Sequence, residues 1–144
     1  MIDQIESLVG AEVGVSDWFE MTQDRVAQFA DATNDHQWIH VDQARAADGP
    51  FGATIAHGFL TLSMIVDLAP MPSVEGVAMA INYGLDRVRF ISPVLVGSRI
   101  RARTKILEVS PIDGGVHMKS EVTIEIENSD RPACVAETLT RYYG

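Results

Sequence analysis

The sequence predicts an α+β fold in which a curved antiparallel sheet is wrapped around a central apolar helix. Two observations carry this prediction. Helical patterns occupy the first half of the chain and strand patterns the second, and consecutive strands without intervening helices form antiparallel sheets. One helical segment, 57–69, is apolar nearly all round, which is typical of a helix surrounded by protein rather than one lying on a surface. We therefore expect the strands to enclose that segment.

Length and composition fit one folded domain over residues 1–144, with 47% hydrophobic and 22% charged residues. A net charge of −9 disfavours nucleic acid and anionic membranes as partners, although local basic residues can still bind a small anion. The N-terminus does not resemble a signal peptide, and no apolar stretch reaches the about 18 residues of a transmembrane helix. We therefore expect a cytoplasmic protein, with Cys134 as a small buried hydrophobe.

The first half of the chain predicts one strand and three helices. In chain order these elements are a strand near 12–19 and helices over 23–32, 43–47 and 57–69. Thr22 and Asp42 are good N-caps for the first two helices, and the first helix has its apolar residues on one face. Asn34 competes with the backbone for hydrogen bonds and ends the first helix, whereas Pro70 ends the third. A turn cluster over 48–52 separates the second helix from the third.

Five segments of the second half predict strands, because they are rich in β-branched and aromatic residues and are bounded by Gly, Pro and Asp. They run over 77–81, 85–90, 99–109, 116–127 and 133–143. Met64 in the apolar helix and Met79 in the first of these strands are expected in the core.

Charge patterning predicts how the third and fourth of these strands pair. Basic residues alternate with apolar ones over 99–106, and acidic residues alternate with apolar ones over 121–127. Folding the strands at Asp113-Gly114 brings opposite charges together on one face and apolar side chains on the other. The predicted pairs are Lys105–Glu121, Arg101–Glu125, Arg99–Glu127, Thr104–Val122, Ala102–Ile124 and Ile100–Ile126. The basic residues should therefore form a neutralised outer face rather than a phosphate site.

The segment 33–41 concentrates side chains capable of acid–base chemistry. Asp35 and His40 lie five positions apart in the loop that leaves the first helix. A carboxylate and an imidazole held in one short segment can share a water, one group taking a proton while the other gives one. The alternative is that Asp35 only helps to stop the helix and that His40 is a satisfied buried imidazole. His36, His40 and His57 make a metal site conceivable, but no Glu is placed as in zinc motifs, so we expect no metal and no cofactor.

Three segments together carry a family resemblance. They are Asp35–His40, Ala56–Leu60 and Arg87–Val94. The chain is similar to the MaoC-like dehydratases, the (R)-specific enoyl-CoA hydratases of the hotdog superfamily, and looks closest to the nodulation-protein-N-like subgroup. The resemblance runs from Thr22 to the final strand. It implies the hotdog fold, in which an antiparallel sheet wraps a long helix.

The resemblance also implies a reaction, the addition of water across the double bond of a trans-2-enoyl-CoA thioester and the reverse dehydration. Asp35 and His40 match the catalytic residues of the family motif Gly-Asp-x-Asn-Pro-(Ile/Leu)-His, in which Asn34, Gln37 and Trp38 here replace Gly, Asn and Pro. The backbone N–H of Gly58 matches the family's donor to the thioester oxygen. The residues expected to bind substrate are Gln37, Trp38, His57, Ser63, Asn82 and Tyr83.

Several roles stay open at this point. His57 is also expected to hold the loop at the helix start, and Ser63 has a bond back along its helix as an alternative. Arg87 and Arg89 are candidates for the CoA phosphates or for a partner subunit. The resemblance implies a homodimer whose sheets run on across the interface, with a substrate tunnel near it. A hotdog acyl-CoA thioesterase and a non-catalytic acyl-thioester binding module are the alternative functions.

Overall fold

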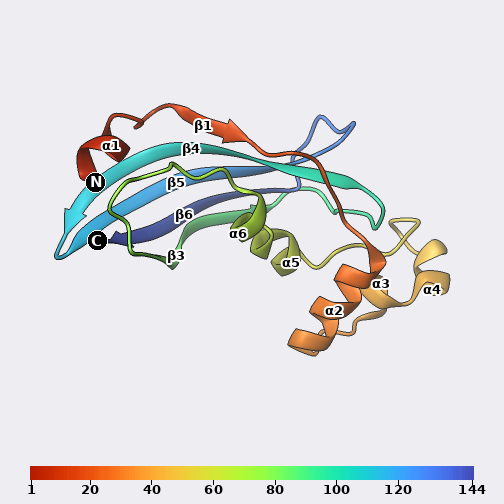
Figure 1. The fold of residues 1–144 in the computed structure, drawn as a ribbon. Helices are drawn as coiled ribbons and strands as arrows, with labels where there is room; N and C mark the ends of the chain where they lie inside the picture. Colours follow the sequence, from red (N-terminus) through yellow and green to blue (C-terminus); the bar gives the residue numbers. More distant parts are fainter.

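A computed structural model describes residues 1–144 and contains one six-stranded antiparallel sheet with short helices beside it (Figure 1). The strands are β1 (Glu12–Val15), β2 (Phe19–Glu20), β3 (Met79–Phe90), β4 (Arg99–Ile112), β5 (Gly115–Ile126) and β6 (Cys134–Tyr143). The helices are α1 (Ile2–Glu6), α2 (Gln23–Thr33), α3 (Trp38–Val41), α4 (Gln43–Ala47), α5 (Gly58–Ser63) and α6 (Ile65–Leu68). The strand order is β1-β4-β5-β6-β3, and β2 also pairs with β4.

The predicted α+β class and the curved antiparallel sheet are confirmed. Helices α5 and α6 lie against one face of the sheet, and α2, α3 and α4 form a group beyond one end of it (Figure 1). The main core lies between α5–α6 and the inner faces of the long strands, where the fully buried residues include Ile100, Val122 and Ile124. This is the arrangement of the hotdog fold, and it sets the helix group next to the start of α5.

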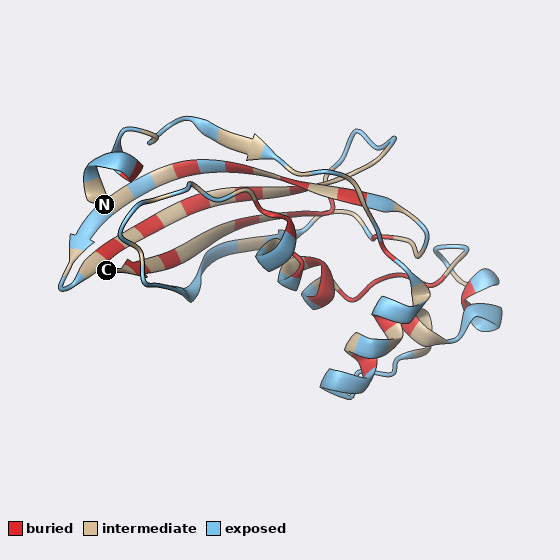
Figure 2. Cartoon of the chain, viewed as in Figure 1, coloured by how far each residue is buried: buried red, intermediate tan, exposed pale blue.

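The central helix differs from its prediction in its continuity, its first residue and its burial. It is divided at Met64 into α5 and α6, and it starts at Gly58 because His57 has the extended backbone of an N-cap. Residues spaced four apart, Leu60, Met64 and Leu68, are buried against the sheet, whereas Phe59 is 70% exposed and Val66 75% exposed. The expectation of a helix surrounded on all sides is therefore wrong within one chain, because the sheet covers only one face of it (Figure 2).

Strand β3 replaces two of the predicted strands, 77–81 and 85–90. Register shifts between Asn82 and Gly84, and between Leu85 and Val88, let one continuous strand pair with β6 across the segment that interrupts the sequence pattern. Met79 lies on this edge strand and is exposed, so its predicted core position is wrong, whereas that of Met64 is confirmed.

The N-terminal region and the loop after α2 also hold elements beyond those predicted. The strand expected near 12–19 is divided into β1 and β2, and helices α1 and α3 were not predicted. The helices expected over 23–32 and 43–47 are confirmed to within one residue as α2 and α4.

The predicted register of β4 and β5 is confirmed. Lys105 lies opposite Glu121, Arg101 opposite Glu125, and Ala102 opposite Ile124, with the turn at 113–114. Three arginines of β4 form ion pairs with acidic residues. These pairs are Arg99–Glu127, Arg101–Glu125 at 3.4 Å, Arg103–Glu125 at 2.9 Å and Arg103–Glu12. The neutralised outer face follows from these pairs.

Two further expectations concern single features of the chain. Cys134 is fully buried, as predicted, and burial raises the pKa of its thiol to about 11. Such a thiol carries almost no reactive thiolate at neutral pH. None of the helices combines the length and the apolar character that a membrane crossing needs.

Candidate active site

Helix α2 positions the segment 33–41, which holds Asp35 and His40. The Thr22 hydroxyl accepts a hydrogen bond from the Arg25 N–H at 3.2 Å and caps the start of the helix, as predicted. The helix ends at Asn34, whose φ of 60° and ψ of 25° lie in the left-handed region that Asn tolerates better than most residues. This reversal of direction leads the chain through Asp35 into α3, which carries His40.

The hydrogen bonds of His40 determine which of its nitrogens is free. Its ring is buried, and Nδ1 lies 2.7 Å from the carbonyl oxygen of Ile55. Because a carbonyl only accepts, Nδ1 carries the hydrogen, and in the neutral ring Nε2 then presents a lone pair. Asp35 is exposed, and one carboxylate oxygen accepts from the Gln37 N–H at 3.4 Å.

His57 links the Asp35 loop to the start of α5. Its Nε2 donates to the backbone carbonyl of Asp35 at 3.0 Å and lies 4.0 Å from the Asp35 carboxylate. Its ring stacks on His40, with 3.8 Å between centroids, and is tilted against Phe29 at 4.9 Å. His57 therefore holds the loop at the helix start, which was one of its two expected roles.

Asp35, His40 and His57 place one ligand-type atom each within 4.8 Å of one another. The lone pairs of imidazole nitrogens lie in the ring planes, and these two rings are nearly parallel, at 23°. Nearly parallel lone pairs do not converge on one ion as tetrahedral zinc requires. The Nε2 of His57 is in addition committed to the Asp35 carbonyl. The geometry therefore suits an acid–base pair better than a metal centre.

Burial lowers the pKa of the His40 imidazole below its usual value of 6.5, and the neighbouring His57 ring lowers it further. The bond to Ile55 and the Asp35 carboxylate act in the opposite direction without outweighing burial. His40 is therefore neutral at neutral pH, and its Nε2 is ready to accept a proton.

The lowered pKa of His40 predicts how stability changes with pH. The unfolded chain takes up a proton on this imidazole near pH 6.5, and the folded chain only at lower pH. The contribution of His40 to the free energy of unfolding is thus fully present above pH 6.5 and is lost as pH drops through the window between the two pKa values. Urea unfolding at several pH values between 5 and 7.5 should show this loss in the parent and a smaller one in His40→Gln. An equal loss in both proteins would contradict the prediction.

Gly58 begins α5 beside the ring of Phe90. A Cβ at this position would lie 2.9 Å from Cδ2 of Phe90, closer than real side chains approach. The sequence gives no sign of this contact between Gly58 and β3. The Gly58 N–H lies in the first turn, where helix amides have no partner within the helix.

An apolar cavity of about 280 Å³ runs along Gly58 and Phe90. Its other lining residues include Phe51, Ile55, Thr61 and Pro93. Ile55 also supplies the carbonyl that binds His40. The cavity and the acid–base pair are therefore built on the same short segment before α5.

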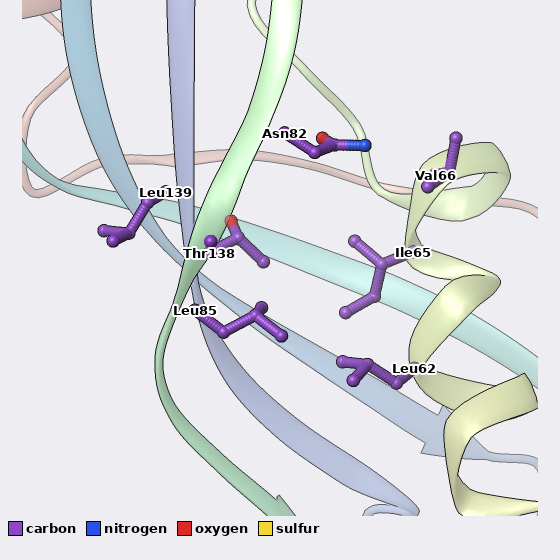
Figure 3. Close-up of a pocket in the computed structure, with 8 residues that line it drawn as sticks. Leu62, Ile65, Val66, Asn82, Leu85, Thr138 and Leu139 are labelled. Carbon is purple, nitrogen blue, oxygen red and sulfur yellow. The ribbon is translucent and has the colours of Figure 1, made fainter.

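A second apolar cavity, of about 200 Å³, lies between α5–α6 and the edge of the sheet (Figure 3). Leu62, Ile65 and Val66 line it from the helices, and Asn82 and Leu85 line it from β3. Tyr83, the neighbour of Asn82, packs elsewhere. The Arg141 guanidinium lies over its ring, 3.6 Å from the ring centroid. The His117 ring packs edge-on against it, with 5.6 Å between the centroids.

The remaining candidates also have definite surroundings. Ser63 Oγ donates to the Leu60 carbonyl at 2.8 Å, the alternative expected for it, and lines a groove beside Phe29 rather than the cavity of Figure 3. Gln37 is the exposed N-cap of α3. Trp38 packs its indole against Gly49 and under the Arg45 guanidinium at 4.2 Å, so its bulk joins α3 to α4 and the turn after it.

Arg87 and Arg89 line a hollow of about 250 Å³ together with Glu121 and Glu137. The carboxylates offset the positive charge there, so this hollow is a poor phosphate site. Arg89 also donates to the carbonyl of Val88 at 2.7 Å.

Gln23 and Thr54 contact the His40 segment and were not predicted. The Gln23 side chain donates to the His40 carbonyl at 2.8 Å and accepts from the Thr54 hydroxyl at 2.6 Å. A glutamine in the first turn of a helix reads as an ordinary helix former. The sequence therefore carries no signal for this contact.

Comparison with known proteins identifies the family of this chain and agrees with its fold. Residues 4–128 match the family model described as MaoC like domain. Over 143 residues the chain is 52% identical to 3-hydroxyacyl-thioester dehydratase Z of Mycobacterium tuberculosis, covering 98% of this chain and 95% of that protein. It is 48% identical to Nodulation protein N of Rhizobium leguminosarum bv. viciae, covering 94% and 87%. The (R)-hydratase from A. caviae involved in PHA biosynthesis superposes with a TM-score of 0.75 at 24% identity, covering 92% and 94%.

The curved antiparallel sheet and the helix against its face are those of a hotdog protein. The chain belongs to the MaoC-like family, as its resemblance in sequence indicated.

Proposed function

We propose that this chain is an (R)-specific hydratase of trans-2-enoyl-CoA thioesters, which runs in reverse as a 3-hydroxyacyl-CoA dehydratase. The observation that carries the proposal is the buried, neutral His40, held through Nδ1 and grouped with the Asp35 carboxylate and with His57, the residue before Gly58. The relative that is 52% identical over nearly its whole length is named as a 3-hydroxyacyl-thioester dehydratase, which supports the same class of reaction here.

In the proposed mechanism a water lies between Asp35 and His40. His40 Nε2 takes one proton as the water oxygen attacks C3, and the Asp35 carboxylate accepts the other O–H of that water and stabilises the imidazolium that forms. The electrons of the C2–C3 double bond move onto the thioester as an enolate. The imidazolium then returns its proton to C2, so both side chains end as they began. The net result is OH on C3 and H on C2.

The enolate needs a donor at the thioester oxygen, and the Gly58 N–H is the proposed one. It lies at the start of α5, where no helix carbonyl competes for it. One such donor typically lowers the barrier by about 3 kcal/mol. A side chain at position 58 would collide with the Phe90 ring, so the proposed donor amide can start α5 here only as glycine.

The cavity of Figure 3 is the proposed acyl site. Leu62 lies four residues beyond Gly58 on α5, about 6 Å along the helix axis. An acyl chain that starts at the Gly58 amide would run along the helix toward Ile65 and Leu85. The apolar lining suits a hydrocarbon chain. Asn82 is the proposed polar contact in this cavity.

A second copy of this chain is the proposed partner. Strand β3 forms one edge of the sheet and is exposed along nearly its whole length. Large apolar side chains are exposed on it and on the helices beside it. They are Ile81, Tyr83, Leu85, Phe90, Phe59 and Val66. An unpaired edge next to such a surface favours pairing with another strand. A dimer joined along β3 would also cover the central helix, which was expected to be surrounded.

Light scattering during size exclusion should give about twice the chain mass of 15.7 kDa. Leu85→Asp with Val66→Asp places two charges in the proposed interface and should shift the protein toward monomer. Val9→Asp, a matched change at a 43% exposed valine after α1, should stay dimeric. A monomeric parent at micromolar concentration would contradict the proposal.

The function is tested by following the loss of enoyl absorbance from crotonyl-CoA and from a longer enoyl-CoA, with thiol release measured in parallel. Loss of absorbance without thiol release is expected, with (R)-3-hydroxyacyl-CoA as the product on chiral analysis. Thiol release without hydration would replace the proposal with a thioesterase. Binding with neither reaction would leave an acyl-thioester binding module.

A further inference from the structure

Gln23 occupies a bridging position between three separate segments. It is the first residue of α2, and its half-buried side chain reaches both α3 and the chain before α5. Because the His40 carbonyl can only accept, the Gln23 nitrogen must face it, and the Gln23 oxygen must face the Thr54 hydroxyl. Both ends of the amide are thus satisfied at 2.8 and 2.6 Å.

The segment reached through Thr54 is itself fixed to the sheet side of the molecule. The Thr54 carbonyl accepts from the Val96 N–H at 2.9 Å, and the Ala56 N–H donates to the Val94 carbonyl at 2.8 Å. Ile55 lies between these two bonds, and its carbonyl holds Nδ1 of His40. The Ile55 N–H also donates to the Ile39 carbonyl of α3 at 3.0 Å, so the group that orients the His40 ring is anchored both to the 94–96 segment and to α3.

The Gln23 amide adds a second link between α3 and this anchor, beside the Ile55–Ile39 backbone bond. Through its nitrogen it fixes the backbone of His40, and through its oxygen it fixes the residue before Ile55. The two bonds of the Gln23 amide therefore fix the distance between the His40 backbone and the Ile55 carbonyl, which binds the His40 ring. We propose that Gln23 and Thr54 form a positioning clamp that keeps Nδ1 of His40 on the Ile55 carbonyl and so keeps Nε2 aimed at the reacting water.

This inference rests on the proposed function for its kinetic consequence, but its structural consequence is independent of activity. Without the clamp, the Ile55–Ile39 backbone bond alone ties α3 to this segment, so α3 can pivot about that bond and the Nδ1 bond lengthens or breaks. The imidazole then loses its fixed tautomer. A displacement of about 1 Å in a catalytic group can cost on the order of 100-fold in rate even when substrate binding is unchanged.

The test uses the full chain with Gln23→Met, Thr54→Val, the double variant and Thr54→Ser. Gln23→Met keeps the length of the side chain without its polar ends, and Thr54→Val keeps the shape without the hydroxyl. Thr54→Ser retains the hydroxyl and is the conservative rescue. Gln28→Met, on the exposed side of the same helix, is the matched control.

Kinetic and spectroscopic readouts are both required. Gln23→Met and Thr54→Val should each lower kcat by about 10–100-fold with KM changed less than about threefold. The double variant should lose little more than the worse single variant, because both remove one link. In ¹⁵N NMR of labelled histidine, His40 should be Nδ1-protonated in the parent, Thr54→Ser and Gln28→Met, and should change its tautomer mixture or pKa in the other variants.

An unchanged His40 tautomer and pKa in Gln23→Met would overturn the clamp, whatever the activity. So would additive losses in the double variant, or a Thr54→Ser protein as slow as Thr54→Val. If the parent does not hydrate enoyl-CoA, the proposed function fails, and the NMR result alone decides whether the clamp exists.

Discussion

Replacing Asp35 with Asn, or His40 with Gln, should lower the hydration rate of crotonyl-CoA by about 10²–10⁴-fold, the usual contribution of a positioned acid–base group. Asn keeps the size of the Asp35 side chain but removes the charge that holds the water and the imidazolium. Gln at position 40 has no nitrogen lone pair to accept the proton. The decisive quantity is kcat, measured at saturating substrate with the folded state checked by circular dichroism.

His36→Gln is the matched control for these variants. His36 belongs to the same segment, but its imidazole is half-exposed and lies 3.8 Å from Asp31, away from the Asp35–His40 pair. It should hydrate as fast as the parent. If Asp35→Asn and His40→Gln also keep the parent rate, the assignment of both catalytic residues is wrong.

Gly58→Ala should have the second largest effect on the hydration rate, because of steric overlap rather than loss of a charge. The new Cβ would meet the Phe90 ring at 2.9 Å, so the ring or the start of α5 must move. Overpacking of this kind costs about 1–3 kcal/mol of folding stability. A shift of the Gly58 amide also removes the proposed donor from the thioester oxygen. We expect a lower midpoint in thermal unfolding and a kcat reduced by about 10²-fold.

Phe90→Leu separates the two consequences. The smaller side chain leaves room for a Cβ, so Gly58→Ala combined with Phe90→Leu should regain most of the stability lost in Gly58→Ala. Phe90→Leu alone is the reference for that comparison. If Gly58→Ala unfolds at the parent temperature and hydrates at the parent rate, neither the packing role nor the donor role of this position holds.

Local patterns in the sequence predicted the fold wherever both partners of an interaction carried a signal. Opposite charges on alternate positions sufficed to register β4 against β5 pair by pair. Local patterns failed at β3, because the segment of irregular register near Tyr83 resembles the boundary between two strands in the sequence. The exposure of Phe59 and Val66 was also unpredictable. An apolar residue in a sequence does not show whether its side chain is buried by the same chain or by a partner.

The candidate site shows the same division. The spacing of Asp35 and His40, and the glycine after His57, predicted that these segments form one site. In the structure Asp35, His40 and His57 do lie together. The contacts of Gln23 and Phe90 were not predictable, because each reaches a residue more than 15 positions away without any charge or pattern to mark it. Such contacts become visible only when the backbone is placed.

The cavity in Figure 3 has a practical consequence for altering this protein. Its wall on the sheet side comes from Leu85 on β3 and Leu139 on β6, whereas Asp35, His40 and Gly58 all precede α6 in the chain. In the proposed site, the sheet-side wall of the cavity and the acid–base residues therefore come from separate stretches of sequence, and only the helix-side wall adjoins Gly58. A library restricted to β3 and β6 can be screened for altered acyl preference while the segment with the proposed catalytic residues is left as it is.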